Sequence, residues 1–356
     1  MTAGSPSFRQ RLVQLQTQLK PGENALISKP NDIFYFTGFP QLAPAEREAF
    51  LLVSVKQATL FHHSFSPTLP RQNWLTSVPK TDLTMIATAI NDQKTKLLLI
   101  DDDTLSVHEY WQLKKLLKCS IKPIDQQWVW RQRTTKDSAE LALMKQAGSI
   151  AAVTFKKIIN ELKPGLTELQ VANRIATLLL EHRAQAPAFP IIVAYGAHGA
   201  LPHHQPSSTK LKPETPVLID FGARYQNYLS DMTRSFWFGK KPSARFLQIE
   251  TIVKAAYQKT FDRLTRRPLT AKDLDATARQ YITKQGFGDQ FIHTAGHGLG
   301  LEIHEPPSLS WQNDAVIRPG TTLTIEPGIY LPGEFGYRYE NTIAIMDKGL
   351  KILTEV

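Results

Sequence analysis

Periodic apolar positions in the last two thirds of the chain predict two pairs of helices. Residues 137–162 and 167–182 form the first pair, and each segment opens on a capping signature, with Asp or Thr three positions before Glu or Gln. Residues 243–264 and 270–285 form the second pair, and Gly286 ends its last helix. The pattern therefore predicts a helix pair that occurs twice.

An acidic β-hairpin is predicted after the first helix pair. Two apolar, β-rich runs at 217–221 and 228–238 are separated by a short polar break. If the turn is centred on residues 225–226, antiparallel pairing places Asp220 opposite Asp231, with Cβ atoms about 4.5 to 5.5 Å apart. Two facing carboxylates repel each other, so this hairpin predicts a cation between them.

A second acidic hairpin is predicted near the end of the chain. Residues 321–326 and 337–345 flank a break with turn-forming residues, and a turn centred on Gly333 places Glu326 opposite Glu340. Cations are the simplest means of holding two such acidic pairs in one fold. The two hairpins therefore predict one metal centre.

Four carboxylates and one imidazole make up the predicted donor set. Oxygen donors with a single nitrogen and no thiolate suit Mn²⁺, which we favour, or Co²⁺, Zn²⁺ or Fe²⁺, and two such ions can hold a water molecule between them. The predicted chemistry is metal-assisted hydrolysis. The predicted metal ligands are Asp220, Asp231, His297, Glu326 and Glu340.

An internal repeat links the two halves of this region. Segments 199–207 and 300–308 match at Gly, His, Pro and Ser with a constant offset of 101 residues, and each lies between a helix pair and an acidic hairpin. A duplicated unit with pseudo-twofold symmetry would enclose the metals and place His203 and His304 on either side of them. His204 adjoins His203, but the offset selects His203.

The first 130 or so residues have a different, α/β pattern. Apolar runs at 49–55, 59–61 and 96–100 predict strands, and segments 8–19 and 107–117 predict helices. A chain of 356 residues can form two ordinary domain cores. We therefore expect an α/β (α+β) protein of two domains, 1–131 and 132–356.

At these residues the chain resembles a known family. The motifs LIDFGA, GHGLGLEIHE, EPGIY and RYEN are similar, in type and spacing, to those of the two-metal peptidases of the pita-bread fold, which include methionine aminopeptidase, aminopeptidase P and prolidase. The resemblance covers the chain from about Lys136 to its end. It implies a pita-bread catalytic domain that binds two metal ions.

The resemblance also implies a role for each predicted ligand. Asp220 would chelate one metal ion, His297 and Glu326 would bind the other, and Asp231 and Glu340 would bridge both. This assignment makes the two acidic pairs parts of one binuclear site.

Catalytic roles follow from the same resemblance. His203 and His304 correspond to histidines that contact the scissile amide, and Glu326 would move the proton of the attacking water to the leaving nitrogen. The residues expected to hold the carboxylates or to line the substrate pocket are Tyr330, Arg338 and His293.

The N-terminal region selects among the relatives. Residues 31–39 resemble a strand-and-turn motif of the creatinase/prolidase N-terminal domain, which favours proline-directed peptidases. Some prolidases have an arginine four residues after the equivalent of His304, where this chain has Ser308. We therefore expect an Xaa-Pro aminopeptidase that acts on proline-containing peptides, with an Xaa-Pro dipeptidase as the alternative.

Composition leaves a second class of function to be weighed. The net charge of +10 could indicate a nucleic-acid-binding protein, but the basic residues are scattered as pairs without a long tract or a known motif. A non-catalytic pita-bread binding module is disfavoured because all five predicted ligands are present. The single cysteine and the lack of a long apolar segment suggest a cytoplasmic protein without a membrane span, and relatives suggest a homodimer.

Overall fold

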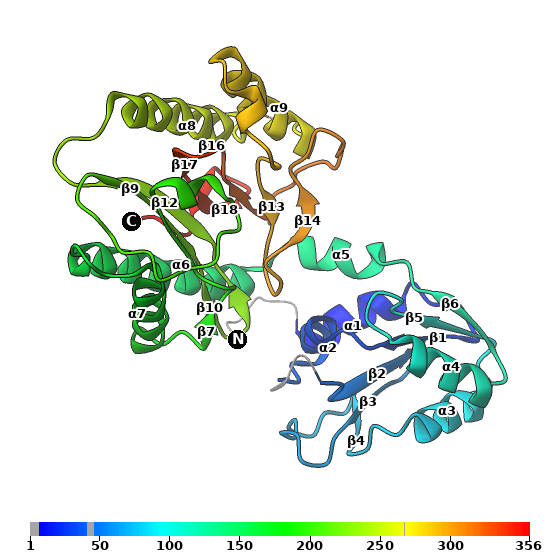
Figure 1. Cartoon of the computed structure of the whole chain (residues 1–356). Helices are drawn as coiled ribbons and strands as arrows, with labels where there is room; N and C mark the ends of the chain where they lie inside the picture. The colour runs from blue at the N-terminus through cyan, green and yellow to red at the C-terminus, as the bar shows by residue number, and fades with distance from the viewer. Residues whose placement is uncertain (1–6, 41–45, 267) are drawn as a thin grey trace. The chain divides into compact units, whose positions relative to one another are not determined.

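The computed structural model describes residues 7–40, 46–266 and 268–356. The chain divides into two compact units between Arg133 and Thr134. No helix in the described parts of the chain is long and apolar enough to cross a membrane. Figure 1 shows the elements of each unit in chain order.

A six-stranded sheet is the framework of the N-terminal unit. Its strand order is β4-β3-β2-β1-β5-β6, and β1 pairs antiparallel with β2 and parallel with β5. The strands are β1 (Glu23–Ile27), β2 (Ala49–Ser54), β3 (Ala58–His62), β4 (Thr76–Val78), β5 (Leu97–Ile100) and β6 (Ser120–Pro123). The helices are α1 (Phe8–Gln16), α2 (Pro30–Thr37), α3 (Leu83–Asp92), α4 (Val107–Leu116) and α5 (Gln127–Thr134).

The α/β pattern predicted for this unit is confirmed, but the strand expected within residues 31–39 is wrong. This segment forms helix α2, with Pro30 at its start and Gly38 at its C-cap in the left-handed region (φ 74°). Proline at the first helical position is already set to a helical φ, and glycine ends a helix without steric cost. The buried Ile33 and Phe36 have the i, i+3 spacing of one helix face.

All four helices predicted in the C-terminal unit are present. They are α6 (Ser138–Glu161), α7 (Glu168–Glu181), α8 (Ala244–Arg263) and α9 (Ala271–Lys284). The capping boxes expected at the starts of α6 and α7 form as predicted, because Asp137 accepts hydrogen bonds from the Ala139 and Glu140 amides and Thr167 accepts one from the Gln170 amide. Gly286 follows α9 with φ 86°.

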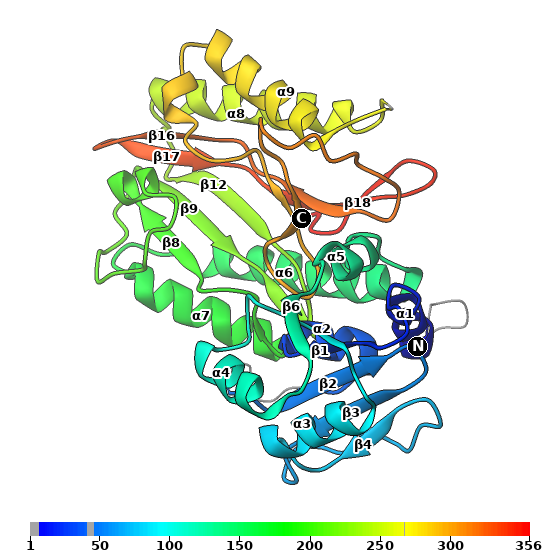
Figure 2. The same ribbon diagram turned by 90° about the vertical axis from the view of Figure 1, so that its right-hand side faces the viewer.

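The two helix pairs cover two different sets of strands. Apolar residues of α6 and α7 pack against the sheet β8-β9-β12, and those of α8 and α9 pack against β15 to β18. Figure 2 shows α6 and α7 beside β8, β9 and β12, and α8 and α9 beside β16 and β17. The strands between the helix pairs are β7 (Ala186–Pro187), β8 (Ile192–Tyr195), β9 (Thr215–Phe221), β10 (Ala223–Tyr225), β11 (Tyr228–Leu229) and β12 (Met232–Phe238). Those after α9 are β13 (His297–Gly298), β14 (Glu305–Ser308), β15 (Thr322–Ile325), β16 (Gly328–Leu331), β17 (Phe335–Arg338), β18 (Asn341–Ile345) and β19 (Leu350–Ile352). This arrangement gives helices on the outside and strands towards the interior of the unit.

The register predicted for the first hairpin is wrong by two residues. Asp220 pairs with Thr233 rather than with Asp231. The turn is centred on Gln226 and Asn227, whose φ angles of 45° and 70° are those of a tight hairpin turn. A shift of two residues leaves side chains on the same face of a sheet, so Asp220 and Asp231 still point to one side.

The register predicted for the second hairpin is confirmed. Ile325 pairs with Asn341 on one side of the acidic pair, and Gly328 pairs with Arg338 on the other, which is the register of a turn centred on Gly333. Gly333 has φ 81°, a conformation that favours glycine. Two ladders in the same register therefore flank Glu326 and Glu340.

Candidate metal centre

One cavity of about 800 Å³ in the C-terminal unit collects the predicted site residues. Its lining includes every one of them except Tyr330, which is buried beside it. The predicted residues in the lining are His203, Asp220, Asp231, His293, His297, His304, Glu326, Arg338 and Glu340. Residues from both halves of the repeat therefore meet at one cavity.

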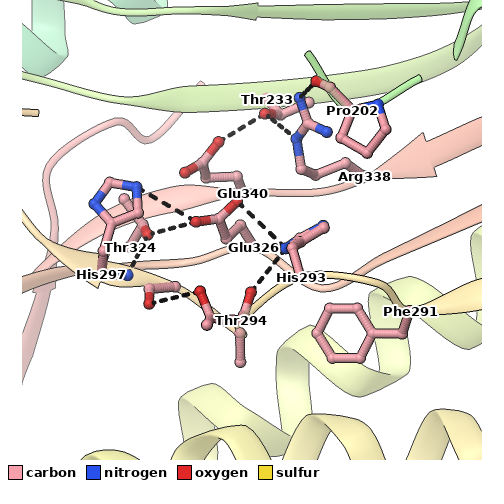
Figure 3. Close-up of polar contacts among 12 residues, drawn as sticks. Pro202, Thr233, Phe291, His293, Thr294, His297, Thr324, Glu326, Arg338 and Glu340 are labelled. Atoms are coloured by element: carbon pink, nitrogen blue, oxygen red, sulfur yellow. Dashed lines mark hydrogen bonds and ion pairs between the residues drawn. The ribbon is translucent and has the colours of Figure 1, made fainter. Parts of the chain in front are cut away.

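The five predicted ligands lie at or next to strand ends. Asp220 is the penultimate residue of β9, Asp231 directly precedes β12, and His297 begins β13. Glu326 directly follows β15, and Glu340 directly precedes β18. At strand ends the chain leaves the ladder, so acidic side chains can gather around a cavity without breaking the sheets. Figure 3 shows Glu326 and Glu340 side by side, with the His297 ring directed at Glu326.

His297 presents a free nitrogen to the carboxylates. Its Nδ1 atom lies 3.0 Å from the Gly298 carbonyl oxygen, which fixes a proton on Nδ1. Its Nε2 atom lies 3.4 Å from Glu326 Oε1 and 3.6 Å from Asp231 Oδ2. Candidate ligand atoms of Asp231, His297 and Glu340 all lie within 4.8 Å of one another. An imidazole held in this tautomer can act as a metal ligand.

The acidic residues are buried together, and this raises their pKa values. Burial is the largest cause for Asp231, followed by the negative charges of Glu340 and Asp220, and its pKa lies well above the usual range. The pKa of Glu340 is raised in the same way, by burial and then by Glu326. Burial also raises the pKa of Glu326. Each carboxylate therefore makes its neighbours harder to ionise unless positive charge enters the site.

Arg338 supplies part of that positive charge from behind Asp220. Its Nη2 atom lies 2.5 Å from Asp220 Oδ2, and its Nη1 atom donates to the Tyr330 hydroxyl at 2.6 Å. The same hydroxyl lies 2.8 Å from His293 Nε2. Arg338 thus contacts one carboxylate of the site directly, Tyr330 contacts Arg338, and His293 lines the cavity beside them.

Two threonines that the sequence analysis did not select also orient the ligands. The Thr233 hydroxyl donates to Glu340 Oε2 at 2.6 Å and accepts from Arg338 Nε at 3.0 Å. The Thr324 hydroxyl donates to Glu326 Oε1 at 3.2 Å and accepts from the His297 amide. Each threonine lies in a strand, two residues from a predicted ligand, Asp231 or Glu326. This spacing was the signal available in the sequence.

The donor set fits divalent cations. The Oδ1 atoms of Asp220 and Asp231 are buried and have no hydrogen-bonding partner among the residues that the structure describes. Burying such oxygens away from water costs free energy unless a cation or a hydrogen-bond donor replaces the lost contacts. Both face a cavity whose other lining includes two more carboxylates and the free nitrogen of His297.

The two repeat-related histidines lie on the cavity outside this acidic cluster. His203 follows the short helix η1 (Gly196–Ala200), and His304 directly precedes β14. The His304 ring stacks edge-on against His297, with ring centroids 4.5 Å apart. His204 points elsewhere, because its Nε2 atom lies 2.9 Å from Glu168. The 101-residue offset therefore selected the histidine that faces the cavity.

Comparison with known proteins now identifies the family. The model of metallopeptidase family M24 matches residues 142–347, and the creatinase/prolidase N-terminal domain matches residues 10–135. The chain belongs to metallopeptidase family M24. This confirms the resemblance inferred from the sequence, and it makes the chain a metal-dependent peptidase.

Relatives within the M24 family match almost the whole chain. An Xaa-Pro dipeptidase of Pyrococcus furiosus is 33% identical over 341 residues, which cover 94% of this chain and 93% of that protein. The structure of an Xaa-Pro dipeptidase from Bacillus anthracis has a TM-score of 0.90 at 29% identity and covers 98% of both chains. An X-Pro aminopeptidase from Thermotoga maritima has a TM-score of 0.84 at 29% identity, with 96% and 97% covered. The predicted two-domain fold, with a pita-bread catalytic domain, is thereby confirmed.

Proposed function

We propose that this M24 peptidase hydrolyses the bond between an N-terminal residue and proline, with two divalent metal ions held by the five predicted ligands. The observation that carries the proposal is the buried donor set itself. Four carboxylates and a neutral imidazole nitrogen converge on one cavity, and two of their buried oxygens have no partner among the described residues. Asp231 and Glu340, whose ligand atoms lie within 4.8 Å of each other and of His297, would hold both metal ions.

Metal ions held by these residues would supply Lewis acidity and would lower the pKa of a bound water molecule to near neutrality. The protein residues do the remaining work. Glu326 accepts the proton of the attacking water and passes it to the proline nitrogen, which has no N–H of its own in the peptide bond. His304 donates a hydrogen bond to the oxyanion that develops on the carbonyl oxygen, and His203 steadies the amide from the other side of the cavity.

The apolar part of the cavity suits a substrate with a proline ring. Phe189, Ile192, Pro202 and Ile303 are among its lining residues. An Xaa-Pro bond cannot form the extended backbone pairing that general peptidases use, because proline lacks an amide hydrogen. An apolar pocket beside the reacting groups replaces that pairing and supports selectivity for proline.

Among proline-directed activities, we now place Xaa-Pro dipeptides first. The similar proteins of Pyrococcus furiosus and Bacillus anthracis are both named Xaa-Pro dipeptidases, and they support the reading that the sequence analysis kept as its alternative. The second candidate is an Xaa-Pro aminopeptidase acting on longer peptides. Ser308 supports it, because this residue lines the cavity four positions after His304 and offers no charge to a substrate carboxylate.

Peptide hydrolysis after metal reconstitution tests the proposal. The full chain is treated with a chelator, loaded with Mn²⁺, Co²⁺ or Zn²⁺, and assayed with Ala-Pro, Ala-Pro-Ala and Ala-Ala-Ala. We expect both proline peptides to be cleaved, the dipeptide with the higher kcat/KM, and the oxygen-rich donors to favour Mn²⁺. Preference for Ala-Ala-Ala would refute the proline-directed assignment, and a preference for Ala-Pro-Ala would support the aminopeptidase candidate.

A further inference from the structure

A buried glutamate outside the cavity gathers an unusual number of donors. Glu168, the first residue of α7, is 0% exposed. Its Oε1 atom accepts from the Tyr195 amide and from His198 Nδ1, each at 2.8 Å. Its Oε2 atom accepts from His204 Nε2 at 2.9 Å, and from the amide and hydroxyl of Ser207 at 3.0 and 2.6 Å.

The residues that bind Glu168 belong to one segment of the chain. Tyr195 and Ser207 mark its two ends, and His198 and His204 lie between them. We call residues 195–207 the His203 loop, because this segment carries Pro202 and His203 to the cavity. A single buried side chain therefore joins both ends of the loop that brings His203 to the site.

His203 depends on this loop for its position. Its side chain is exposed, and no hydrogen bond of its ring is found among the residues that the structure describes. Its neighbour His204 is fixed by Glu168, and the Pro202 carbonyl lies 3.4 Å from Arg338 Nη2. The backbone on either side of His203 is thus held, while the ring itself is free to face a substrate.

Glu168, His198 and His204 could be mistaken for a second metal site, since their ligand atoms lie within 4.8 Å of one another. A carboxylate has about four lone-pair positions. Five protein donors already occupy those of Glu168. Burial raises the pKa of Glu168, but hydrogen bonds, led by those of Ser207, outweigh it and lower the pKa overall, so the group is ionised at neutral pH. The arrangement is that of an anchored carboxylate.

We propose that Glu168 is a positioning residue that sets the place of His203 by clasping both ends of the His203 loop. The inference rests on the role proposed above for His203. A displacement of about 1 Å at a reacting group can cost about 10²-fold in rate. Loosening the clasp should therefore lower kcat through His203, without a change in bound metal.

The second half of the repeat offers a matched comparison. Glu305 directly follows His304, and its Oε1 atom accepts from the amides of Leu301 and Glu302 at 2.9 and 3.2 Å. Its Oε2 atom lies 3.0 Å from Lys136 Nζ. Each catalytic histidine thus has its own buried glutamate, and the effects of the two glutamates should be separable.

A double-mutant cycle tests the inference. Glu168→Gln preserves shape but loses acceptor positions, and we expect kcat to fall about tenfold or more in the otherwise unchanged enzyme. In a His203→Ala background the same substitution should lower kcat less than about threefold, because the group that it positions is already gone. Glu181→Gln, at the exposed end of the same helix, should leave kcat unchanged.

Glu305→Gln sharpens the cycle, since its effect should persist in the His203→Ala background and shrink in a His304→Ala background. Equal losses from Glu168→Gln with and without His203 would overturn the inference, because they would indicate a purely structural role. If His203→Ala itself keeps full kcat, the role proposed for His203 fails. If His203→Ala is impaired but Glu168→Gln is not, the inference alone fails.

Two further measurements cover the case in which Glu168→Gln does not fold. His204→Gln retains a side-chain N–H that can donate to Glu168, whereas His204→Leu does not, so kcat should fall in the Leu variant and be largely retained in the Gln variant. Hydrogen exchange of the amides in residues 195–207 should quicken in His204→Leu while metal content stays constant. Equal kcat and equal exchange in the two variants would refute the clasp.

Discussion

The two units each bury acidic residues close together, but the surroundings of the two acidic clusters differ. In the N-terminal unit, burial and the nearby Asp32 raise the pKa of Asp101 to about 7. Asp32 in turn lies 2.6 Å from Arg133 Nη1. In the C-terminal unit, Asp231 and Glu340 have raised pKa values for the same reasons, burial and acidic neighbours.

An unpartnered oxygen does not distinguish the two clusters, because the Oδ1 atom of Asp101 is also buried without a hydrogen-bonding partner in the described chain. The differences are the number of acids and the space in front of them. Asp101 accepts the amides of Ser28 and Lys29 through Oδ2, and one proton neutralises it. The cluster of the C-terminal unit has four carboxylates around a cavity of about 800 Å³. Burial beside one other acid raises the pKa of Asp101 towards neutrality, whereas four acids buried around a cavity form a donor set that fits cations.

The largest expected effect comes from removing one negative charge of the proposed metal site. Asp231→Asn and Glu340→Gln should each abolish hydrolysis and release metal while the protein stays folded, because a neutral amide cannot supply the negative charge that would hold a cation. Activity and metal content by atomic absorption are measured together, with Asp101→Asn as the matched control, which should keep both. Activity that survives within about tenfold, about 1.4 kcal/mol of barrier, would falsify the assignment of two metals.

A smaller effect is expected at the histidines that share the cavity but lie outside the acidic cluster. His304→Ala and His203→Ala should each lower kcat by about 10² to 10³, because they stabilise the reacting amide rather than the metals. Metal content should stay near that of the unchanged enzyme, whereas His297→Ala should lose metal. If a variant at 203 or 304 loses metal as fully as the variant at 297, that histidine is a ligand and belongs to the cluster.

Much of the C-terminal unit could be predicted because local signals and the global fold agree there. The capping box at Asp137 and the helix stop at Gly286 depend on neighbouring residues alone. The Glu326–Glu340 register was predictable because Gly333 is suited to the turn that sets it. In the first hairpin the turn residues Gln226 and Asn227 carry a weaker signal, since neither is glycine, and the register was placed two residues away.

Other parts of the structure depend on contacts that no local pattern reports. Residues 31–39 are rich in aromatic residues, which favours a strand, but Pro30 and Gly38 bound them as a helix. Glu168 resembled an ordinary residue of a capping segment. The contacts of Glu168 form only when the His203 loop folds back over the start of α7, where the Tyr195 and Ser207 amides donate to this carboxylate. Long-range closure of this kind cannot be read from sequence spacing.

A further prediction concerns the cavity of the C-terminal unit. A dipeptide substrate brings a free carboxylate next to its proline, and Ser308 offers it no charge. Ser308→Arg should therefore raise the ratio of kcat/KM for Ala-Pro over Ala-Pro-Ala by about tenfold, through a charge-assisted hydrogen bond. Ser310→Arg, two residues further on, is the control for added charge. An unchanged ratio in the Ser308 variant would show that the substrate carboxylate lies elsewhere.

The last expected effect is a pH-dependent loss of stability in the N-terminal unit. The folded pKa of Asp101, about 7, lies above the value of about 3.9 expected when unfolded. Between these values the folded state holds one proton more than the unfolded state. The contribution of Asp101 to stability is therefore full below about pH 4 and is lost as the pH rises through 7. Each unit of pKa difference corresponds to about 1.4 kcal/mol, so the loss is a few kcal/mol at most.

Urea unfolding of the full chain at pH 5 and pH 8 measures this loss, and Asp101→Asn should flatten the difference because it cannot ionise. Asp125→Asn is the control, because this exposed acid of the same unit accepts a hydrogen bond from the Gln127 amide, and it should leave the difference between pH 5 and pH 8 unchanged. Added Mn²⁺ should not restore stability to the N-terminal unit at pH 8, whereas it should stabilise the C-terminal unit by mass action. A metal-dependent rise in the stability of the N-terminal unit would contradict this difference between the two units, since it would mean that Asp101 and Asp32 also bind a cation.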